Sequence, residues 1–295
     1  MDVRRLGYFL AVVDQGDSGR AAEHPLTDQP SLSSEAVASL EHELGVQLFH
    51  RVGRGVVLSD AGRQLVEPAR RVLRDVEAAR AVIDSVQGLQ RGRIHLVTTP
   101  SPGIEPLATL TASVRESHPG LVVDVAAAFT RQEVVESVRT GTTELGLLGT
   151  PGPVRTPDLS VVHLGNQPLV LVSPAGSDLP DTVQPDDLDD QPMVVSQPGS
   201  LIRTLVDDLL AGETRMRITA QVAHRTSILP LVLAGVGHAV VPASWTALAR
   251  GAGAEVRTLR RTIYLNVSLI SRSDGLSPAA QAFVDAARTY ARQVS

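Results

Sequence analysis

The sequence predicts an α/β protein overall, built from three parts. These are an N-terminal all-α winged helix-turn-helix over residues 1–58, a long coiled-coil linker helix over residues 59–88, and a two-lobed α/β domain over residues 93–295. Three observations support this prediction. Two short helical patterns lie on either side of a polar break near the N-terminus, a heptad repeat follows them, and strands then alternate with helices along the rest of the chain.

The composition limits the classes of function. The chain has 295 residues, which suggests two or more units, and its formal net charge is −5. It contains no cysteine, which excludes a disulfide framework, a thiolate zinc site and a cysteine redox sensor. No apolar run reaches ~18 residues, so we expect no membrane span. The short apolar run near the N-terminus lacks a signal-peptide cleavage pattern, so we expect a cytoplasmic protein.

The N-terminal part is typical of a helix-turn-helix. Apolar residues at helical spacing from Val3 to Val13 predict a first helix. Residues 20–23 carry the pattern of a second helix and residues 29–41 that of a third, with a capping oxygen and a proline at the break between them. Small alanines let the second and third helices cross closely. The polar face of the third helix is then free to enter a DNA major groove.

Candidate DNA contacts lie at the start of the third helix and in the hairpin, or wing, that follows it. Gln29 could pair with adenine in a bidentate manner, and Arg51 and Arg54 could contact phosphate or the minor groove. The alternative is ordinary surface polarity. Residues 1–60 contain five arginines and nine acidic residues, a balance of −4, whereas DNA-binding domains are usually basic. The candidates are Arg20, Asp28, Gln29, Pro30, Ser31, Ser33, Ser34, Arg51 and Arg54.

A seven-residue repeat of apolar side chains begins after Gly62. The spacings alternate between four and three residues for about three heptads, and charged residues fill the positions between them. This pattern is typical of a coiled coil, so we expect the chain to pair with a second copy. The alternative is a long amphipathic helix that packs on its own domain. The predicted seam consists of Leu65, Ala69, Val72, Val76, Ala79, Ile83 and Val86.

From Arg93 onward, the alternation of strands and helices predicts parallel sheets in two lobes. The first lobe takes residues 93–167 and 272–295, and the second takes residues 168–271. Apolar strands at 169–174 and 263–271 stand where the chain could cross between the lobes. Two crossing strands would create a hinged cleft between them.

Polar residues that follow strand ends in both lobes are the candidate ligand contacts of this cleft. Hydroxyl groups, amide donors and an arginine beside helix N-termini suit a carboxylate or another polar anion. The alternatives are ordinary strand-end polarity and, for Arg225, an ion pair with an acid elsewhere. The candidates are Thr99, Pro100, Ser101, Thr130, Gly149, Thr150, Ser196, Gln197, Pro198, Gly199, Arg225 and Thr226.

Catalytic motifs are not found in the sequence. It has no Gly-x-Ser-x-Gly, no His-Glu-x-x-His and no phosphate loop, and its histidines show no metal-ligand spacing. We therefore expect neither an enzyme nor a resident cofactor or metal ion.

Many spaced positions resemble those of LysR-type transcriptional regulators, and the resemblance covers essentially the whole chain. It implies a winged helix-turn-helix, a dimerising linker helix and a periplasmic-binding-protein-like effector domain. It also implies a homodimer or homotetramer that binds double-stranded operator DNA and responds to a small metabolite. The matching positions are Leu6, Phe9, Val12, Gly16, residues 20–23, 29–33, 40–41, 44–45 and 48–49, Arg51, residues 58–59 and 61–62, and the second-lobe segment 234–242.

Four positions depart from the family pattern. Ser18 and Thr27 place hydroxyl groups where a core would favour carbon, and Pro25 would end the second helix early. Asp28 can cap the third helix, but its carboxylate would face phosphate. These departures leave open an alternative function. The chain could be a dimeric metabolite-binding protein whose degenerate helix-turn-helix no longer binds DNA specifically.

Overall fold

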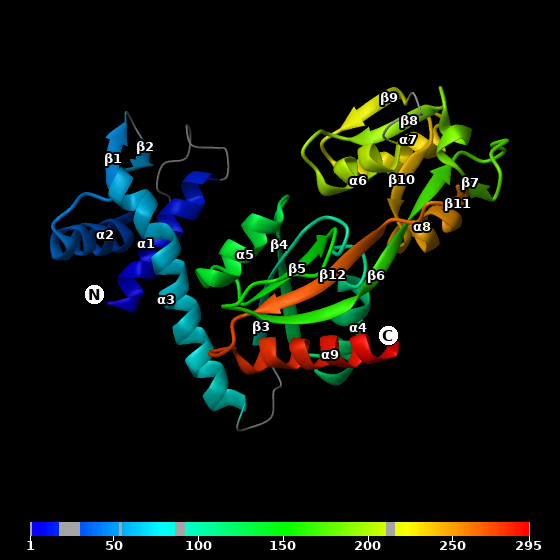
Figure 1. Cartoon of the computed structure of the whole chain (residues 1–295). Coiled ribbons are helices and arrows are strands. Elements are labelled where there is room, and N and C mark those ends of the chain that lie inside the picture. Colours follow the sequence, from blue (N-terminus) through cyan, green and yellow to red (C-terminus); the bar gives the residue numbers. More distant parts are fainter. Residues whose placement is uncertain (1, 18–29, 53–54, 86–91, 211–215, 295) are drawn as a thin grey trace. The chain divides into compact units, whose positions relative to one another are not determined.

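The chain divides into two compact units, Met1–Gln87 and Gly88–Ser295 (Figure 1). This computed structural model describes residues 2–17, 30–52, 55–85, 92–210 and 216–294. None of the helices in these ranges is long and apolar enough to cross a membrane.

The N-terminal unit contains the predicted first and third helices, α1 (Val3–Asp17) and α2 (Pro30–Leu44). The predicted hairpin is formed by the antiparallel strands β1 (Phe49–Val52) and β2 (Gly55–Leu58). The predicted second helix at residues 20–23 lies outside the described residues, as do Ser18, Pro25 and Thr27. The elements that the structure does describe, α1, α2, β1 and β2, confirm the fold class predicted for this part of the chain.

The core of the N-terminal unit comes from one stripe of α1. Leu6, Phe9, Leu10 and Val13 are spaced to share a face of the helix, and all four are buried against α2 and the hairpin. The carboxylate of Glu41 on α2 accepts hydrogen bonds from the backbone N–H groups of Leu48 (2.7 Å) and Phe49 (3.1 Å). These bonds fix the start of β1 against the end of α2.

The linker helix α3 (Asp60–Ser85) begins on this core. The Ser59 hydroxyl accepts a hydrogen bond from the Gly62 N–H (2.9 Å), which caps the helix. Ala69 is only 1% exposed in the core, and Leu65 and Val72 pack partly buried against the same core. The first part of the predicted seam therefore serves packing within the unit. Val76 is half-buried and Ala79 is exposed, Ile83 lies in α3, and Val86 lies outside the described residues.

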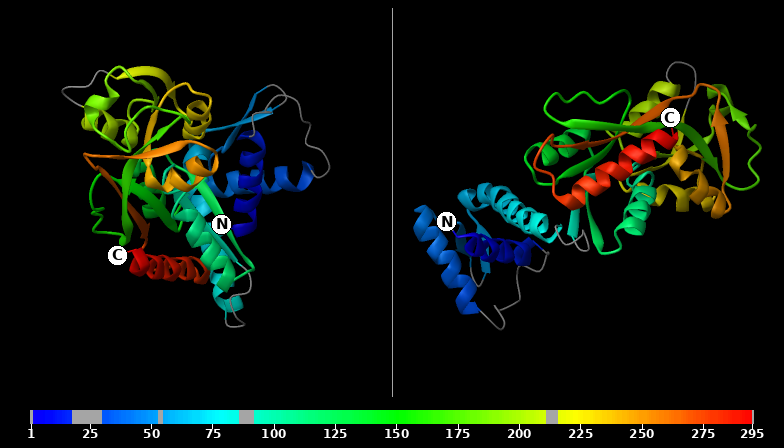
Figure 2. Two further views of the ribbon diagram at one scale, coloured as in Figure 1. Left: turned by 90° about the vertical axis from the view of Figure 1, so that its right-hand side faces the viewer. Right: turned by 90° about the horizontal axis from the view of Figure 1, so that it is seen from below.

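Lobe I of the C-terminal unit is one sheet with helices on both faces. Ile94, Leu96, Leu145 and Leu147 pack toward α4 and α9, whereas their neighbours Val97 and Leu148 pack toward α5. Figure 2 shows α9 lying along the strands of this sheet. The elements are β3 (Gly92–Thr98), α4 (Leu107–Ser117), β4 (Leu121–Ala127), α5 (Arg131–Arg139), β5 (Leu145–Thr150), β6 (Ser160–Ser173), β12 (Tyr264–Ser271) and α9 (Pro278–Val294).

Lobe II is built on the second half of β6, which pairs with β10 and β11. A separate parallel pair, β8 and β9, carries α6 and α7. The elements are β7 (Thr182–Val183), η1 (Pro185–Leu188), β8 (Pro192–Ser196), α6 (Leu201–Leu210), β9 (Arg217–Val222), η2 (Arg225–Ser227), α7 (Ile228–Leu233), β10 (Ala239–Pro242), η3 (Ala243–Trp245), α8 (Thr246–Gly251) and β11 (Glu255–Leu259).

The crossing strands differ from the prediction. β6 begins at Ser160, earlier than the predicted strand at 169–174. The prediction missed its first half because residues 160–168 include a glycine and a proline and show no long apolar run. β12 pairs with β5 and β6 in lobe I, and β11, which precedes it, pairs with the second half of β6 in lobe II, so the chain passes from lobe II to lobe I between these two strands. Both strands run antiparallel to their neighbours, so the sheets are mixed and not purely parallel as predicted.

Candidate functional site

A cavity of about 450 Å³ lies in the C-terminal unit and is lined by residues of both lobes. The structure brings most of the predicted ligand contacts together here. Thr226 is the exception, since it lies in η2 and is exposed outside the lining. The predicted residues in the lining are Thr99, Pro100, Ser101, Thr130, Gly149, Thr150, Ser196, Gln197, Pro198, Gly199 and Arg225.

The ends of β3 and β5 form the floor on the side of lobe I. The Thr99 hydroxyl accepts a hydrogen bond from the Gly149 N–H (3.2 Å), which joins the two strand ends. A Cβ at Gly149 would lie only 2.8 Å from a methyl carbon of Leu265, whose side chain lines the cavity. Glycine is therefore needed here for β12 to pack closely. Thr150 donates to the Gly152 carbonyl (2.6 Å), so its hydroxyl proton is already used.

The N-terminus of α5 adds a second edge. Thr130 caps the helix by accepting a hydrogen bond from the Glu133 N–H (3.2 Å), and the Glu133 carboxylate accepts one from the Phe129 N–H (2.7 Å). The Phe129 N–H, the larger influence, and Thr130 together hold the pKa of Glu133 below its ordinary value. Arg131 begins the helix and lines the cavity. Sequence reasoning missed Phe129, which is 64% exposed, because an apolar residue at a strand end normally belongs to a core.

On the side of lobe II, β8 ends at Ser196 and a short turn leads into α6. Gly199 has φ +85°, a left-handed conformation that favours glycine. The Ser200 hydroxyl accepts a hydrogen bond from the Arg203 N–H (3.3 Å) and caps α6. The first turns of α5 and α6 thus both border the cavity, and the positive ends of both helix dipoles favour an anion there.

Arg225 is the charged group that lobe II contributes to the lining of the cavity. Its Nη1 group donates to the Ser101 hydroxyl (2.7 Å), a bond that joins lobe II to lobe I. Its Nε and Nη2 atoms are buried and have no partner in the part of the chain that the structure describes. Burial lowers the pKa of Arg225 to about 10, so the guanidinium stays charged at neutral pH. The ion pair considered as an alternative is not formed within the described residues.

The predicted DNA contacts that the structure describes lie at the start of α2 and in the hairpin. Pro30, Ser31, Ser33 and Ser34 belong to the first two turns of α2, which begins at the predicted proline. Arg51 lies on β1 opposite Val56. Arg20, Asp28, Gln29 and Arg54 lie outside the described residues.

Comparison with known proteins decides the family. Residues 3–63 match the model of a "bacterial regulatory helix-turn-helix protein, lysR family", and residues 87–292 match the "LysR substrate binding domain". The chain belongs to the LysR family. It is a DNA-binding transcription regulator with a C-terminal effector-binding domain.

Relatives of known name agree with this assignment. The chain is 31% identical over 299 residues to the HTH-type transcriptional regulator TfdS of Cupriavidus pinatubonensis, a match that covers 98% of each protein. It is 29% identical over 288 residues to IlvR of Caulobacter vibrioides, covering 95% of each. The structure of CbnR bound to its target DNA matches 98% of this chain and 100% of that one, with 25% identity and a TM-score of 0.75. A degenerate helix-turn-helix is therefore not favoured.

The DNA-binding unit of this LysR-family member neutralises several of its own arginines. Arg5 pairs with Glu43 (2.9 Å), Arg63 pairs with Asp60, and Arg70 pairs with Asp14. These contacts use basic groups that could otherwise meet phosphate. The acidic balance noticed in the sequence is thus also visible in the ion pairs of the folded unit.

Proposed function

We propose that a small organic anion binds in the cavity between the lobes and controls how this regulator acts on DNA. The observation that carries the proposal is at Arg225, whose Nε and Nη2 atoms are buried and have no partner among the described residues. A buried cation with unused donors is costly unless a ligand or counter-ion satisfies it.

The charges around the cavity support an anion over a cation or a neutral ligand. The lining contains two arginines, Arg131 from lobe I and Arg225 from lobe II, and the described lining includes no aspartate or glutamate. The hydroxyl groups of Ser101 and Ser196, together with the N-termini of α5 and α6, add further donors. A ligand with a carboxylate and a polar or apolar body would match this combination.

On the DNA side, we propose that the start of α2 enters the major groove and that the wing contacts the backbone. Gln29 would read one base, and Arg51 and Arg54 would contact phosphate or the minor groove. The part of α3 beyond Val72 would pair with a second copy, as a homodimer or as a dimer of dimers. Effector binding would then change how two pairs of DNA-binding units sit on the operator. We place this action in the cytoplasm, where bacterial operator DNA lies.

Footprinting on the DNA that flanks its own gene tests the proposal. The folded dimer should protect a defined site at physiological salt, and a carboxylate-containing ligand should change the pattern of protection. The Arg225→Lys variant should keep the basal footprint and lose its response to the ligand, because lysine keeps the charge but not the planar donor pair. Arg139→Lys serves as the control outside the cavity and should respond like the parent. Absence of protection at every salt concentration would contradict the proposal.

A further inference from the structure

The turn that leads from α2 into the wing is held mainly by one residue, Glu41. The backbone carbonyl of Glu41 accepts hydrogen bonds from the N–H groups of Gly45 (2.9 Å) and Val46 (3.3 Å). Its carboxylate oxygen Oε1 accepts two more, from the N–H groups of Leu48 (2.7 Å) and Phe49 (3.1 Å). Glu41 therefore binds four of the five backbone N–H groups between Gly45 and Phe49.

The linker helix α3 holds the same turn from the other side. The Ser59 N–H donates to the Leu48 carbonyl (2.9 Å), and the Ser59 hydroxyl donates to the Gln47 carbonyl (2.6 Å). A Cβ at Gly62 would lie only 2.1 Å from the Leu48 carbonyl oxygen, so the first turn of α3 can approach this closely only with glycine. Residues 45–49 are thus fixed between the end of α2 and the start of α3.

This turn determines how α2 and the wing are placed relative to each other. Phe49 is the first residue of β1, and its ring packs against that of Phe9 in α1, with the ring centroids 5.5 Å apart. Leu48, directly before it, is buried in the core of the unit. Because the wing starts where α2 ends, loss of the hydrogen bonds in the turn would let the two elements tilt against each other.

We propose that Glu41 is a positioning residue that fixes the angle between α2 and the wing, and that it thereby sets the selectivity of this regulator for its operator. The inference builds on the proposed contacts of α2 and the wing with DNA. It adds a residue that acts on selectivity through the placement of the residues that contact the bases and the phosphates.

A small tilt at Glu41 has a large effect at the other end of α2. The helix begins at Pro30, eleven residues earlier, which corresponds to about 16 Å along its axis. A tilt of about 10° would move the start of the helix by roughly 3 Å, more than a base hydrogen bond tolerates. Phosphate contacts from long arginine side chains adapt to such a shift, whereas bidentate base contacts do not. Loosening the turn should therefore reduce selectivity more than general affinity for DNA.

Two conservative variants separate the geometry of Glu41 from its charge. Both side-chain bonds end on Oε1, so the amide oxygen of Glu41→Gln can accept them without a charge. Glu41→Asp keeps the charge, but its side chain is one methylene shorter and does not reach both N–H groups. Glu41→Ala removes the acceptor altogether. Glu43→Ala is the matched control, because it removes the same charge from the same helix at a residue that pairs with the side chain of Arg5 (2.9 Å).

DNA binding of the full chain is measured by fluorescence anisotropy with two duplexes at constant salt. One duplex carries the DNA that flanks its own gene, and the other is a shuffled duplex of the same length and composition. The parent should prefer the first by about tenfold or more. Glu41→Ala and Glu41→Asp should lower this preference by about tenfold or more, mainly through weaker binding to the first duplex. Glu41→Gln should stay within about threefold of the parent, since only the charge assistance of the bonds is lost. Glu43→Ala should keep the preference, because a freed Arg5 strengthens binding to both duplexes alike.

The absence of cysteine permits a second measurement, made without DNA. Spin labels at Glu35→Cys in α2 and Val57→Cys in β2, both exposed positions, report the distance between the helix and the wing. Labelled protein is diluted with unlabelled protein, so that only distances within one chain are recorded. The distance distribution should broaden or shift in Glu41→Ala and Glu41→Asp, and it should match that of the parent in Glu41→Gln. Circular dichroism and thermal unfolding confirm that each variant is folded.

The outcomes separate this inference from the proposed DNA contacts. If the parent does not prefer the flanking DNA, the proposed contacts are wrong and the inference fails with them. If the parent is selective and folded Glu41→Ala and Glu41→Asp keep its preference, Glu41 has no positioning role while the DNA contacts stand. A fall in Glu41→Gln as large as that in Glu41→Ala would show that charge decides, which also overturns the inference.

Discussion

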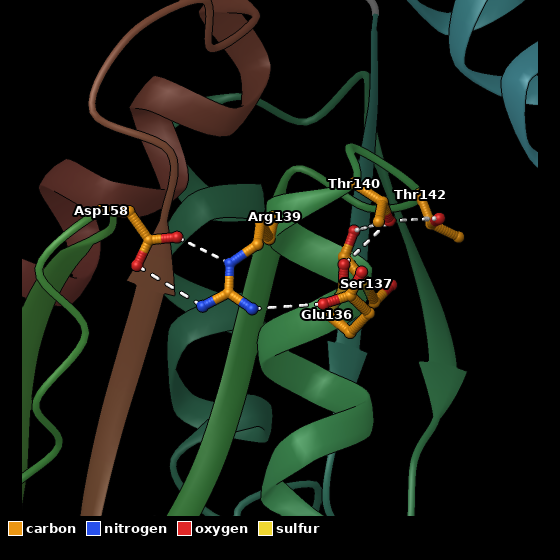
Figure 3. Close-up of polar contacts among 6 residues, drawn as sticks. All are labelled: Glu136, Ser137, Arg139, Thr140, Thr142 and Asp158. Atoms are coloured by element: carbon orange, nitrogen blue, oxygen red, sulfur yellow. Dashed lines mark hydrogen bonds and ion pairs between the residues drawn. The ribbon is translucent and has the colours of Figure 1, made fainter.

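Arg139 and Arg225 belong to the same unit and use their guanidinium groups in opposite ways. Arg139 is exposed at the end of α5, and its Nε and Nη2 atoms donate to the carboxylate of Asp158 (Figure 3). This pairing raises the pKa of Arg139 and lowers that of Asp158. Arg225 is half-buried beside the cavity, its Nε and Nη2 atoms are buried without a partner in the described chain, and burial lowers its pKa to about 10.

The difference between the two arginines is the basis for proposing a ligand beside Arg225. An exposed arginine that pairs with its own chain is screened by water and contributes little to stability. An arginine with buried donors that have no partner lowers the stability of the fold, and a bound anion would offset that loss. The following substitutions test whether this contrast holds.

The largest effect on ligand affinity is expected for Arg225→Met, with Arg139→Met as the matched control. Arg225→Met should weaken carboxylate binding by about 100-fold or more, because two charge-assisted hydrogen bonds are lost. The same change should raise the free energy of unfolding by roughly 1–3 kcal/mol, since a buried cation without a counter-ion is removed. Calorimetry and urea unfolding measure both quantities. Arg139→Met should leave ligand affinity unchanged, and a loss of affinity equal to that of Arg225→Met would contradict the contrast.

The linker helix offers a second contrast between internal packing and external pairing. Ala69→Asp should destabilise the N-terminal unit by roughly 3 kcal/mol or more, because the carboxylate would be buried in its core. Val76→Asp should leave that unit folded and raise the dissociation constant of the dimer about tenfold or more. Analytical ultracentrifugation with circular dichroism distinguishes the two. An unchanged dimer in Val76→Asp would show that α3 serves its own unit only.

A further comparison between two arginines concerns DNA binding. Arg54→Ala should weaken binding to all sequences alike and lower the slope of log K against log salt by about one, as for a lost phosphate contact. Arg70→Ala should leave the slope unchanged, because Asp14 already neutralises that guanidinium. Fluorescence anisotropy across a salt series measures both slopes. Equal slopes for the two variants would remove the distinction.

A smaller effect concerns His238, which is buried and hydrogen-bonded to the Ser173 hydroxyl (2.9 Å). Burial first, and then the nearby positive charge of Arg257, lower the pKa of His238 below its ordinary value of 6.5. The unfolded chain therefore takes up a proton before the folded chain does as pH falls below 6.5. The stability that this neutral histidine provides is present above that pH and is lost as pH falls, by up to about 1.4 kcal/mol per pH unit. The melting temperature of His238→Gln should fall less steeply with acid than that of the parent.

The smallest change is expected from Asp28→Ser, which replaces the residue predicted to cap the third helix. Serine can still act as a cap, and the repulsion between a carboxylate and phosphate disappears. Binding to the operator should become a few-fold tighter, as measured by anisotropy at low salt. Unchanged affinity would show that this departure from the family pattern does not hinder DNA binding.

Much of the cavity could be predicted from the sequence because of one rule of sheet geometry. The carboxyl ends of neighbouring parallel strands meet at one edge, so the residues after β3, β4 and β5 had to lie together. Arg225 was found for a related reason, since it follows a strand end in the second lobe. What could not be predicted is the state of its donors, because hydrogen-bond partners depend on contacts between distant segments such as Ser101 and Arg225.

The errors have physical reasons as well. The first half of β6 contains Gly165 and Pro168 and has no long apolar run, so only its second half was predicted as a strand. In the linker, the heptad spacing is real, but the sequence does not reveal that Ala69 is already buried in its own unit. Periodicity specifies a face of a helix and leaves open which partner covers it.

The most direct measurement follows the arginine side chains themselves. In the full chain with ¹⁵N-labelled arginine, the Nε–H signals of Arg225 and Arg139 are assigned by substitution and recorded while acetate is added. The Arg225 signal should shift with acetate and not with acetamide. The Arg139 signal should stay in place because the Nε of Arg139 already donates to Asp158. An Arg225 signal that does not respond, or that moves no more than the signal of Arg139, would contradict an anion site at Arg225.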